Sequence, residues 1–190
     1  MEAVERLRAA AEHHGAWLRP VVKPEERVAV AVLLAHADAA EKADPAYVAE
    51  LARWRTHDRE QEGVPDAALL DGPVGLRGSE FALRDFDSTT VTPDRTTEPP
   101  VPEHPLVVVI GTDHDDREDW TRAGMAMGRV LLQATVDDLA ASPMTQVVEV
   151  ERLRARLRKE LGLVGSPQVV LRLGYGQGRM TTRRRPVEEV

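Results

Sequence analysis

The sequence predicts a protein of mixed helices and strands (α/β), with two strands in the second half of the chain. LVVVIGT at 106–112 is a continuous β-branched run, the pattern of a strand buried on both faces of a sheet. QVVLRLGYG at 168–176 predicts the second strand. Elsewhere, apolar residues recur at three- and four-residue spacing, which indicates amphipathic helices. The 190 residues are enough for one ordinary hydrophobic core.

The first 56 residues predict helices only. Residues 2–18 place apolar side chains on one helical face. Pro24, followed by two glutamates, predicts the start of a second helix that runs to about residue 43. The dipeptide Asp44-Pro45 combines a capping residue with a proline suited to the first helical turn, and predicts a third helix.

Residues 57–103 contain glycines and prolines that interrupt every periodic pattern, together with the Thr/Pro-rich stretch TTVTPDRTTEPPVP. A loop of this length inside a compact domain is uncommon, and it is usually functional or wraps a partner. We predict a mobile arm here. The short island from Phe81 to Phe86 is either a strand or an anchor for this loop.

After the strand at 106–112, a polar segment precedes a long helix from about Trp120 to Leu139, which Ser142-Pro143 ends. A charged helix is predicted from about Glu149 to Leu161. Two strands do not easily form a stable sheet by themselves. We therefore expect the remaining strands to come from another subunit or from a segment that this sequence lacks.

The composition excludes several classes of protein. The chain has 32 acidic and 25 basic residues, so its formal charge of −7 argues against general binding to nucleic acids or membrane surfaces. Its lack of cysteine excludes disulfides, thiolate zinc sites and cysteine nucleophiles. The start of the chain has no apolar leader, and the longest apolar run, 28–35, is too short to span a bilayer. We expect a cytoplasmic protein with no nucleic-acid or membrane partner.

Two segments are candidates for binding a ligand. Arg183, Arg184 and Arg185 form a local cluster, and guanidinium groups match phosphate oxygens in a bidentate manner. By spacing alone, a solvated basic tail is the commoner explanation of such a run. In LAASPMTQ at 139–146, small residues and a proline leave backbone N–H groups accessible to a ligand. The alternative for this segment is a simple turn between two helices.

Other patterns do not predict chemistry. The glycines of 174–178 are not followed by a helix, as a dinucleotide-binding fingerprint requires. Residues 113–116 have the composition of a metal cluster, but we favour the interpretation that an aspartate here caps the following helix, and we predict no metal. No paired carboxylates or Ser/His/Asp arrangement is apparent, so we assign no catalytic residue.

Taken in order, the motifs resemble the nitroreductase family. LVVVIGT, AGMAMGRVLLQAT, LAASPMTQ, PQVVLRLGYG and RRRPVEEV are similar to the C-terminal half of that family, and most closely to its tandem, Acg-like branch, in which two halves are fused. DPAYVAELARW and EGVPDAAL resemble the junction between such halves. The resemblance covers nearly the whole chain. Its most specific parts are AGMAMGRVLLQAT, LAASPMTQ and the LGYG and RRRPVEEV segments.

The resemblance implies an α+β sandwich that works as a dimer or pseudo-dimer and binds FMN at the interface, near the helix around Gly124. It implies that Arg184, with Arg183, meets the flavin phosphate. The residues that it places beside the isoalloxazine ring are Ser142, Pro143, Met144 and Thr145. The implied activity is FMN-mediated hydride transfer from NAD(P)H to a small-molecule acceptor such as a nitroaromatic compound or a quinone, in which the cofactor does the chemistry and the protein orients it.

Two expected features are missing: an Arg-Ser-x-Arg segment for the phosphate, and an Asn/Gln/Pro-Trp segment beside the flavin. We therefore expect a truncated, C-terminal portion without the N-terminal half of the fold. Its parts are the end of a first half at 1–56, a lid-like arm at 57–103 and an α/β portion at 104–190. Such a chain needs a homodimer or a partner that supplies the missing half. Alternatives are a non-catalytic FMN-binding or sequestering protein, or an interaction module whose sheet edge pairs with another chain.

Overall fold

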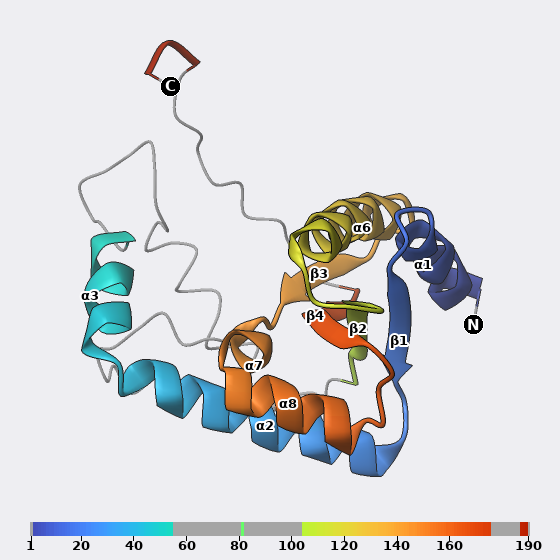
Figure 1. Ribbon diagram of the computed structural model, residues 1–190. Coiled ribbons are helices and arrows are strands. Elements are labelled where there is room, and N and C mark those ends of the chain that lie inside the picture. Colours follow the sequence, from blue (N-terminus) through green and yellow to red (C-terminus); the bar gives the residue numbers. More distant parts are fainter. Residues whose placement is uncertain (1, 55–80, 82–103, 176–186, 190) are drawn as a thin grey trace, which may run out of the picture. The chain divides into compact units, whose positions relative to one another are not determined.

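The computed structural model describes residues 2–54, 81, 104–175 and 187–189 (Figure 1). The chain divides into two compact units, which we describe separately. The sheet unit comprises Met1–Ala37 and Pro105–Gln177, and the second unit comprises Asp38–His104 and Gly178–Val190. The arm predicted at 57–103 lies outside the described residues except for Phe81, whose side chain is buried.

The sheet unit contains a four-stranded antiparallel sheet in the order β1-β2-β4-β3. Its strands are β1 (Trp17–Val21), β2 (Leu106–Thr112), β3 (Ala140–Pro143) and β4 (Ser166–Gly174). The two central strands, β2 and β4, are the two that the sequence predicts. Together with its helices the sheet forms an α+β arrangement.

The prediction that the first 56 residues contain helices only is wrong. Helix α1 (Glu2–Glu12) ends early, Gly15 adopts a φ of 71°, and the chain then enters β1. Glycine reaches this left-handed conformation without steric cost, so it allows the reversal. Leu18 on β1 shares a core with Leu7 on α1, and this shared core made 2–18 resemble one helical face.

The long helix does not reach Leu139 as predicted, and the alternative interpretation of 139–146 as a simple turn between two helices is wrong. Helix α6 (Arg117–Val136) ends earlier, Asp138 has a φ of 60°, and the small residues that follow form β3. Pro143 is tolerated because β3 is an edge strand, where a missing N–H breaks no ladder. Strands β1 and β3 thus come from this chain, contrary to the expectation that they come from elsewhere.

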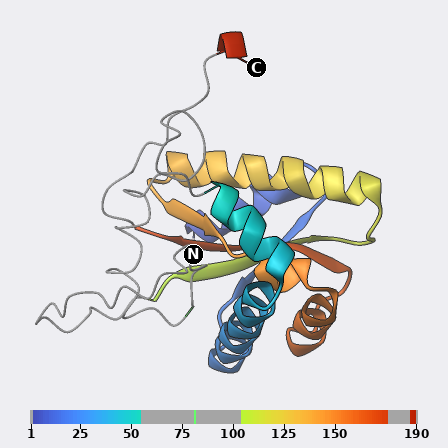
Figure 2. The same cartoon turned by 90° about the vertical axis from the view of Figure 1, so that its left-hand side faces the viewer.

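Helices cover both faces of the sheet. Helices α1 and α6 lie on one face, and the part of α2 (Pro24–Lys42) up to Ala37 lies on the other with two further helices (Figures 1 and 2). These are α7 (Gln146–Glu149) and α8 (Glu151–Glu160). The predicted helices beginning at Pro24 and Pro45 are both present, the latter as α3 (Pro45–Trp54), whose residues belong to the second unit. The 3₁₀ helix η2 (Val187–Glu189) belongs to that unit too.

Side chains of β2 are buried on both faces of the sheet, as predicted. Val108 and Ile110 join the core beneath α1 and α6, while Val107 and Val109 alternate to the opposite face and are equally buried. The α1/α6 core takes further residues from the helices and from β4, among them Leu7, Ala126, Val130, Val169, Leu171 and Leu173.

The start of α6 confirms the capping interpretation of residues 113–116. The carboxylate of Asp116 accepts hydrogen bonds from the backbone N–H groups of Glu118 and Asp119, at 2.9 and 3.0 Å. These bonds satisfy two of the donors that a helix start leaves open. Among the described helices, none is both long and apolar enough to cross a bilayer.

Candidate functional site

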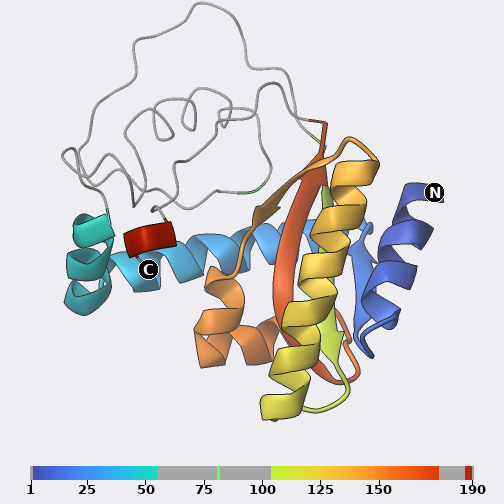
Figure 3. The same ribbon diagram turned by 90° about the horizontal axis from the view of Figure 1, so that it is seen from above.

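The predicted ring-binding residues lie at the β3 edge, by which we mean β3 and the turn after it, residues 140–146. On one side β3 pairs with β4, and within the described part of the chain no strand pairs with its other side (Figure 3). Ala140 and Pro143 are exposed, and Ala141 and Ser142 are partly exposed. The edge therefore presents backbone and small side chains, which is an accessible surface for a flat ligand.

Of the four residues predicted to contact the ring, Ser142, Pro143 and Thr145 are at least partly exposed, whereas the side chain of Met144 is buried. Met144 is only 1% exposed, and its N–H donates to the carbonyl oxygen of Val170 at 2.8 Å. The hydroxyl of Thr145 donates to the carboxylate of Glu149. Ser142 is thus the residue of this group whose side-chain oxygen is best placed to meet a ligand.

The predicted phosphate residues, Arg183 and Arg184, lie outside the described residues. Strand β4 leaves the sheet at Gly174, beside the start of β3, and Tyr175 beyond it is 85% exposed. Of the six predicted site residues, the structure therefore brings together the four of the β3 edge.

Arg172 on β4 is a candidate that the sequence interpretation missed. It lies directly opposite Ser142 of β3 on one side and Val107 of β2 on the other. Because directly paired residues of antiparallel strands share a face, these three side chains lie on the same face of the sheet. The two-residue alternation in QVVLRLG already separates Arg172 from Leu171 and Leu173, and this signal was available in the sequence.

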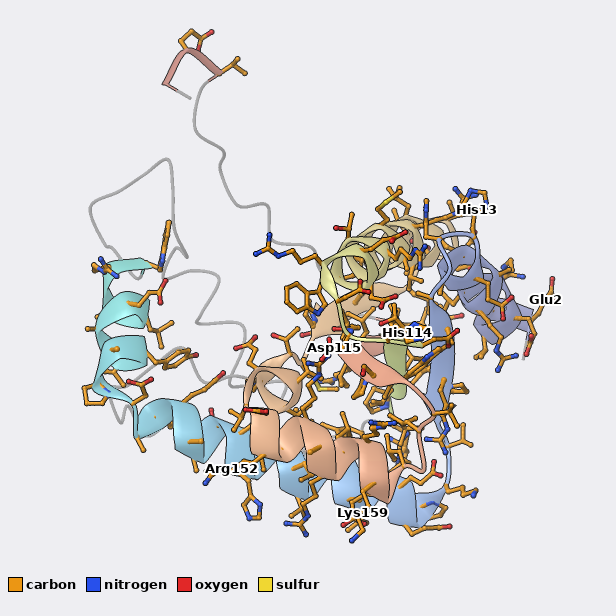
Figure 4. The ribbon with its side chains drawn as sticks, viewed as in Figure 1. Glu2, His13, His114, Asp115, Arg152 and Lys159 are labelled. Carbon is orange, nitrogen blue, oxygen red and sulfur yellow. The ribbon has the colours of Figure 1, made fainter. Side chains whose placement is uncertain are left out.

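The opposite end of β4 carries a different polar cluster, which we call the Asp115 network. Arg154 donates to both carboxylate oxygens of Asp115 at 2.8 Å, and Trp120 Nε1 donates to Asp115 Oδ1 at 2.7 Å. Gln168 Nε2 donates to the Thr112 hydroxyl at 3.0 Å and to Asp115 at 3.1 Å. Figure 4 shows Asp115 in the segment that leads into α6.

Hydrogen bonds from Arg154 lower the pKa of Asp115 from 3.8 to about 2, and burial opposes this shift while the bonds from Trp120 and Gln168 add to it. Arg154 also donates to the Pro167 carbonyl at 2.8 Å and to Gln168 Oε1 at 2.9 Å. A carboxylate this fully bonded and this acidic is unsuited to proton transfer near neutral pH. The Asp115 network joins α8, β4 and the start of α6, and we interpret it as structural.

Comparison with known proteins gives relatives in Mycobacterium tuberculosis. Two proteins provisionally named NAD(P)H nitroreductases, acg and Rv3131, are each 30% identical to the chain, over 151 and 172 residues. The uncharacterised protein Rv3127 is 28% identical over 193 residues. These alignments cover 77%, 89% and 97% of this chain but only 44%, 47% and 53% of the relatives. The chain thus spans about half the length of the curated relatives that it matches.

A solved structure of a nitroreductase-like family protein from Bacillus cereus is similar with a TM-score of 0.48 and 15% identity, over 98% of this chain and 80% of that one. The model of the nitroreductase family matches residues 2–175. The match begins at α1, so it includes β1 as well as the β3 edge and β4. The chain belongs to the nitroreductase family.

Proposed function

We propose that the chain binds FMN at the β3 edge and forms part of an NAD(P)H-dependent oxidoreductase that reduces nitroaromatic or quinone-like acceptors. Membership of the nitroreductase family supports this proposal, as does the phrase NAD(P)H nitroreductase in the names of two relatives. The observation that carries it is the β3 edge itself, whose outer side pairs with no strand of the described ranges and whose side chains are small and at least partly exposed.

The residues of this edge suit a flavin. An isoalloxazine ring is flat, with polar atoms along its rim, so it needs a surface without bulky side chains and with hydrogen-bonding groups at its border. Ala141 and Ser142 meet the first need, and backbone groups on the outer side of β3 with the Ser142 hydroxyl meet the second. Pro143 adds an apolar surface with no N–H to satisfy. The Met144 side chain is buried, so it does not interrupt this surface.

When bound, FMN supplies the hydride-transfer chemistry. In this proposal the residues of the chain bind and orient the cofactor. Ser142 orients the ring through its hydroxyl, and the backbone of β3 holds the ring against the sheet edge. Arg183 and Arg184 provide positive charge for the phosphate. NAD(P)H and the acceptor would then approach the exposed side of the bound ring.

We further propose that the chain corresponds to the C-terminal half of a tandem, Acg-like protein and that it works with a second copy or with a first half. The alignments, which cover about half of each relative, support this. Helix α6 also presents an apolar outer face, where Met125, Leu132 and Val136 are 52%, 70% and 79% exposed. A cytoplasmic location remains part of this proposal.

Two glycines lie within α6, at positions 124 and 128. A Cβ added to either one would meet no atom of the described residues within 4 Å. A glycine inside a helix costs about 1 kcal/mol relative to alanine. Because packing against the described part of the chain does not explain either glycine, we propose that they allow the close approach of a partner to α6.

A flavin titration tests the proposed function. FMN is added to the purified chain, bound flavin is followed by its fluorescence and visible absorption, and NADPH is then added without oxygen. Binding followed by bleaching of the visible band supports the oxidoreductase, whereas binding without reduction supports a sequestering protein instead. Absence of binding would contradict the proposal for this chain.

The arginine tail can be tested in the same titration. Replacement of Arg183 and Arg184 by alanine should raise the dissociation constant for FMN by at least about tenfold, since hydrogen bonds to charged groups contribute about 1.5–3 kcal/mol. The matched control replaces Arg152 and Arg158, two exposed arginines of α8 (Arg152 is labelled in Figure 4). An equal effect in both double variants would show that only net charge matters.

A further inference from the structure

We infer that the side-chain amide of Gln146 binds the pyrimidine edge of the flavin ring and so fixes the direction in which the ring lies along the β3 edge. The inference rests on the proposed function and adds to it a residue that decides which flavins are accepted. It starts from the burial of Gln146, a polar residue at the end of the β3 edge that is only 2% exposed.

Gln146 differs in its hydrogen bonds from two other buried polar residues of the sheet unit. The carboxylate of Glu26 accepts a hydrogen bond from Arg19 at 2.7 Å, and the hydroxyl of Thr112 donates to the carbonyl oxygen of His114 at 2.8 Å. The amide of Gln146 bonds to no residue in the part of the chain that the structure describes. Its donors and acceptors are therefore left for a partner from outside these residues.

A buried amide without a partner is unfavourable. A glutamine side chain has two N–H donors and a carbonyl oxygen that can accept two hydrogen bonds. Burial removes these groups from water, and the fold gains nothing in exchange unless new bonds replace the old ones. A methionine has the same length and would fill this position without that cost. A bound ligand that hydrogen-bonds the amide explains why a glutamine stands here.

The backbone around Gln146 is held in place on both sides. The N–H of Met144 donates to the carbonyl oxygen of Val170 on β4 at 2.8 Å, and the carbonyl oxygen of Gln146 accepts from the N–H of Val150 at 3.4 Å. Val147, the next residue, is completely buried. A ligand on the β3 edge therefore meets the amide without first having to order the backbone that carries it.

The length of the β3 edge agrees with a flat ring system. Strand β3 ends at Pro143, and α7 begins at Gln146 (Figure 1). Ser142 and Gln146 are four residues apart, and four residues of chain span at most about 14 Å. A system of three fused rings can contact both residues. A ring that meets the Ser142 hydroxyl can thus present one of its ends to Gln146.

The pyrimidine edge of an isoalloxazine ring matches a primary amide. This edge carries an N–H donor, at ring nitrogen N3, between two carbonyl groups. The Gln146 carbonyl oxygen can accept from this N–H while its own N–H group donates to one of the ring carbonyls, which gives two parallel hydrogen bonds. The opposite end of the ring carries two methyl groups and offers no such atoms. The amide therefore selects the pyrimidine end.

A flavin with a methyl group on N3 tests the inference, because it lacks the N–H donor and is otherwise the same as FMN. The unchanged chain should bind FMN at least about tenfold more tightly than 3-methyl-FMN, since the methylated ring leaves the buried amide oxygen without a donor. Gln146→Met should bind FMN about tenfold more weakly and discriminate little between the two flavins. Gln133→Met, at a partly exposed glutamine of α6, is the control and should bind both flavins as the unchanged chain does.

Equal affinity of the unchanged chain for FMN and 3-methyl-FMN would overturn the inference and leave the proposed function in place. A preference for FMN that persists in Gln146→Met would overturn it as well, because another group would then read N3. A chain that binds neither flavin would overturn the proposed function and this inference together.

Thermal unfolding without flavin separates a ligand contact from a structural one. An amide without a partner in the fold does not stabilise the flavin-free chain, so Gln146→Met should unfold at the same temperature as the unchanged chain or at a higher one. Circular dichroism follows the transition. A lower melting temperature for Gln146→Met would show that a buried water molecule or another group already bonds the amide, and would overturn its assignment to the flavin.

Discussion

The two ends of strand β4 differ in how their polar residues are used. At the Asp115 end, Gln168, Arg154 and Asp115 bond to one another and to neighbouring groups at 2.7–3.1 Å. At the β3 end, Ser142 is partly exposed on a strand edge with which no other strand of the described residues pairs. Networks whose donors and acceptors are all matched fix structure, whereas accessible polar groups on an open edge can bind a ligand. We therefore expect changes at the first end to alter stability and changes at the second to alter binding.

The largest effect is expected at Gly111, at the Asp115 end of β2. A Cβ at this position would lie 2.1 Å from Trp17 Cζ2 and 2.5 Å from the carbonyl oxygen of Ser166. Gly111→Ala should lower the free energy of unfolding by about 3 kcal/mol, because a close-packed site must shift to admit the methyl group. Urea denaturation measures the change. A loss below about 0.5 kcal/mol would show that Trp17 and the Ser166 carbonyl move aside easily and that this end of the sheet is not tightly packed.

Asp115→Asn should lower the free energy of unfolding by about 1 kcal/mol at neutral pH. The pKa shift from 3.8 to about 2 would suggest more, but the Asp115 side chain is 39% exposed and solvent screens the pair. Because the folded protein holds this pKa below its unfolded value, the contribution is present above about pH 4 and is lost as the pH falls toward 2. Denaturation of both proteins at several pH values measures this.

The two curves of unfolding free energy against pH should converge as the pH falls toward 2. A constant difference between the unchanged chain and Asp115→Asn across this range would mean that the carboxylate charge does not stabilise the network.

Ser142→Ala, at the β3 end, should leave the free energy of unfolding within about 0.5 kcal/mol of its original value, since partly exposed positions tolerate such changes. The same variant should raise the FMN dissociation constant about fivefold, the effect of one hydrogen bond. Ser166→Ala, at a partly exposed serine at the Asp115 end of β4, is the matched control and should not affect FMN. If Ser142→Ala and Ser166→Ala bind FMN with the same dissociation constant, the β3 end of the sheet is no more a binding site than the Asp115 end.

The smallest effect is expected at Gly128, on the outer face of α6. Gly128→Ala should raise the stability of the isolated chain by about 0.5–1 kcal/mol, because alanine is the better helix former and none of the residues that the structure describes lies near the new methyl group. If a partner approaches α6 closely, the same variant should weaken association in analytical ultracentrifugation. A variant that is more stable and associates unchanged would count against α6 as the partner surface.

The sequence predicted correctly those helices and strands whose residue pattern is compatible with only one kind of secondary structure. The β-branched run at 106–112 has no helical alternative, and Pro24 and Pro45 mark helix starts through a fixed backbone angle. It did not predict β1 and β3, which have five and four residues and each contain a proline. In such short segments the tertiary pairing decides the structure, because propensity is a weak determinant there.

In the candidate site, too, local sequence patterns predicted some features and tertiary pairing decided the others. The small residues at 139–146 identified the β3 edge as accessible, yet spacing could not show that Met144 points into the core or that Ser142 faces Arg172. That pairing depends on the register between strands separated by about 30 residues, which local patterns do not encode. Alternation along β4 could have marked Arg172, like Gln168, as a polar residue between apolar positions.

The most direct test of the difference between the two ends measures the FMN dissociation constant and the free energy of unfolding for two variants, Ser142→Ala and Asp115→Asn. We expect Ser142→Ala to weaken FMN binding about fivefold with little change in stability. Asp115→Asn should lower stability and leave FMN binding as it was. Weaker FMN binding in Asp115→Asn with unchanged binding in Ser142→Ala would contradict the assignment of the two ends.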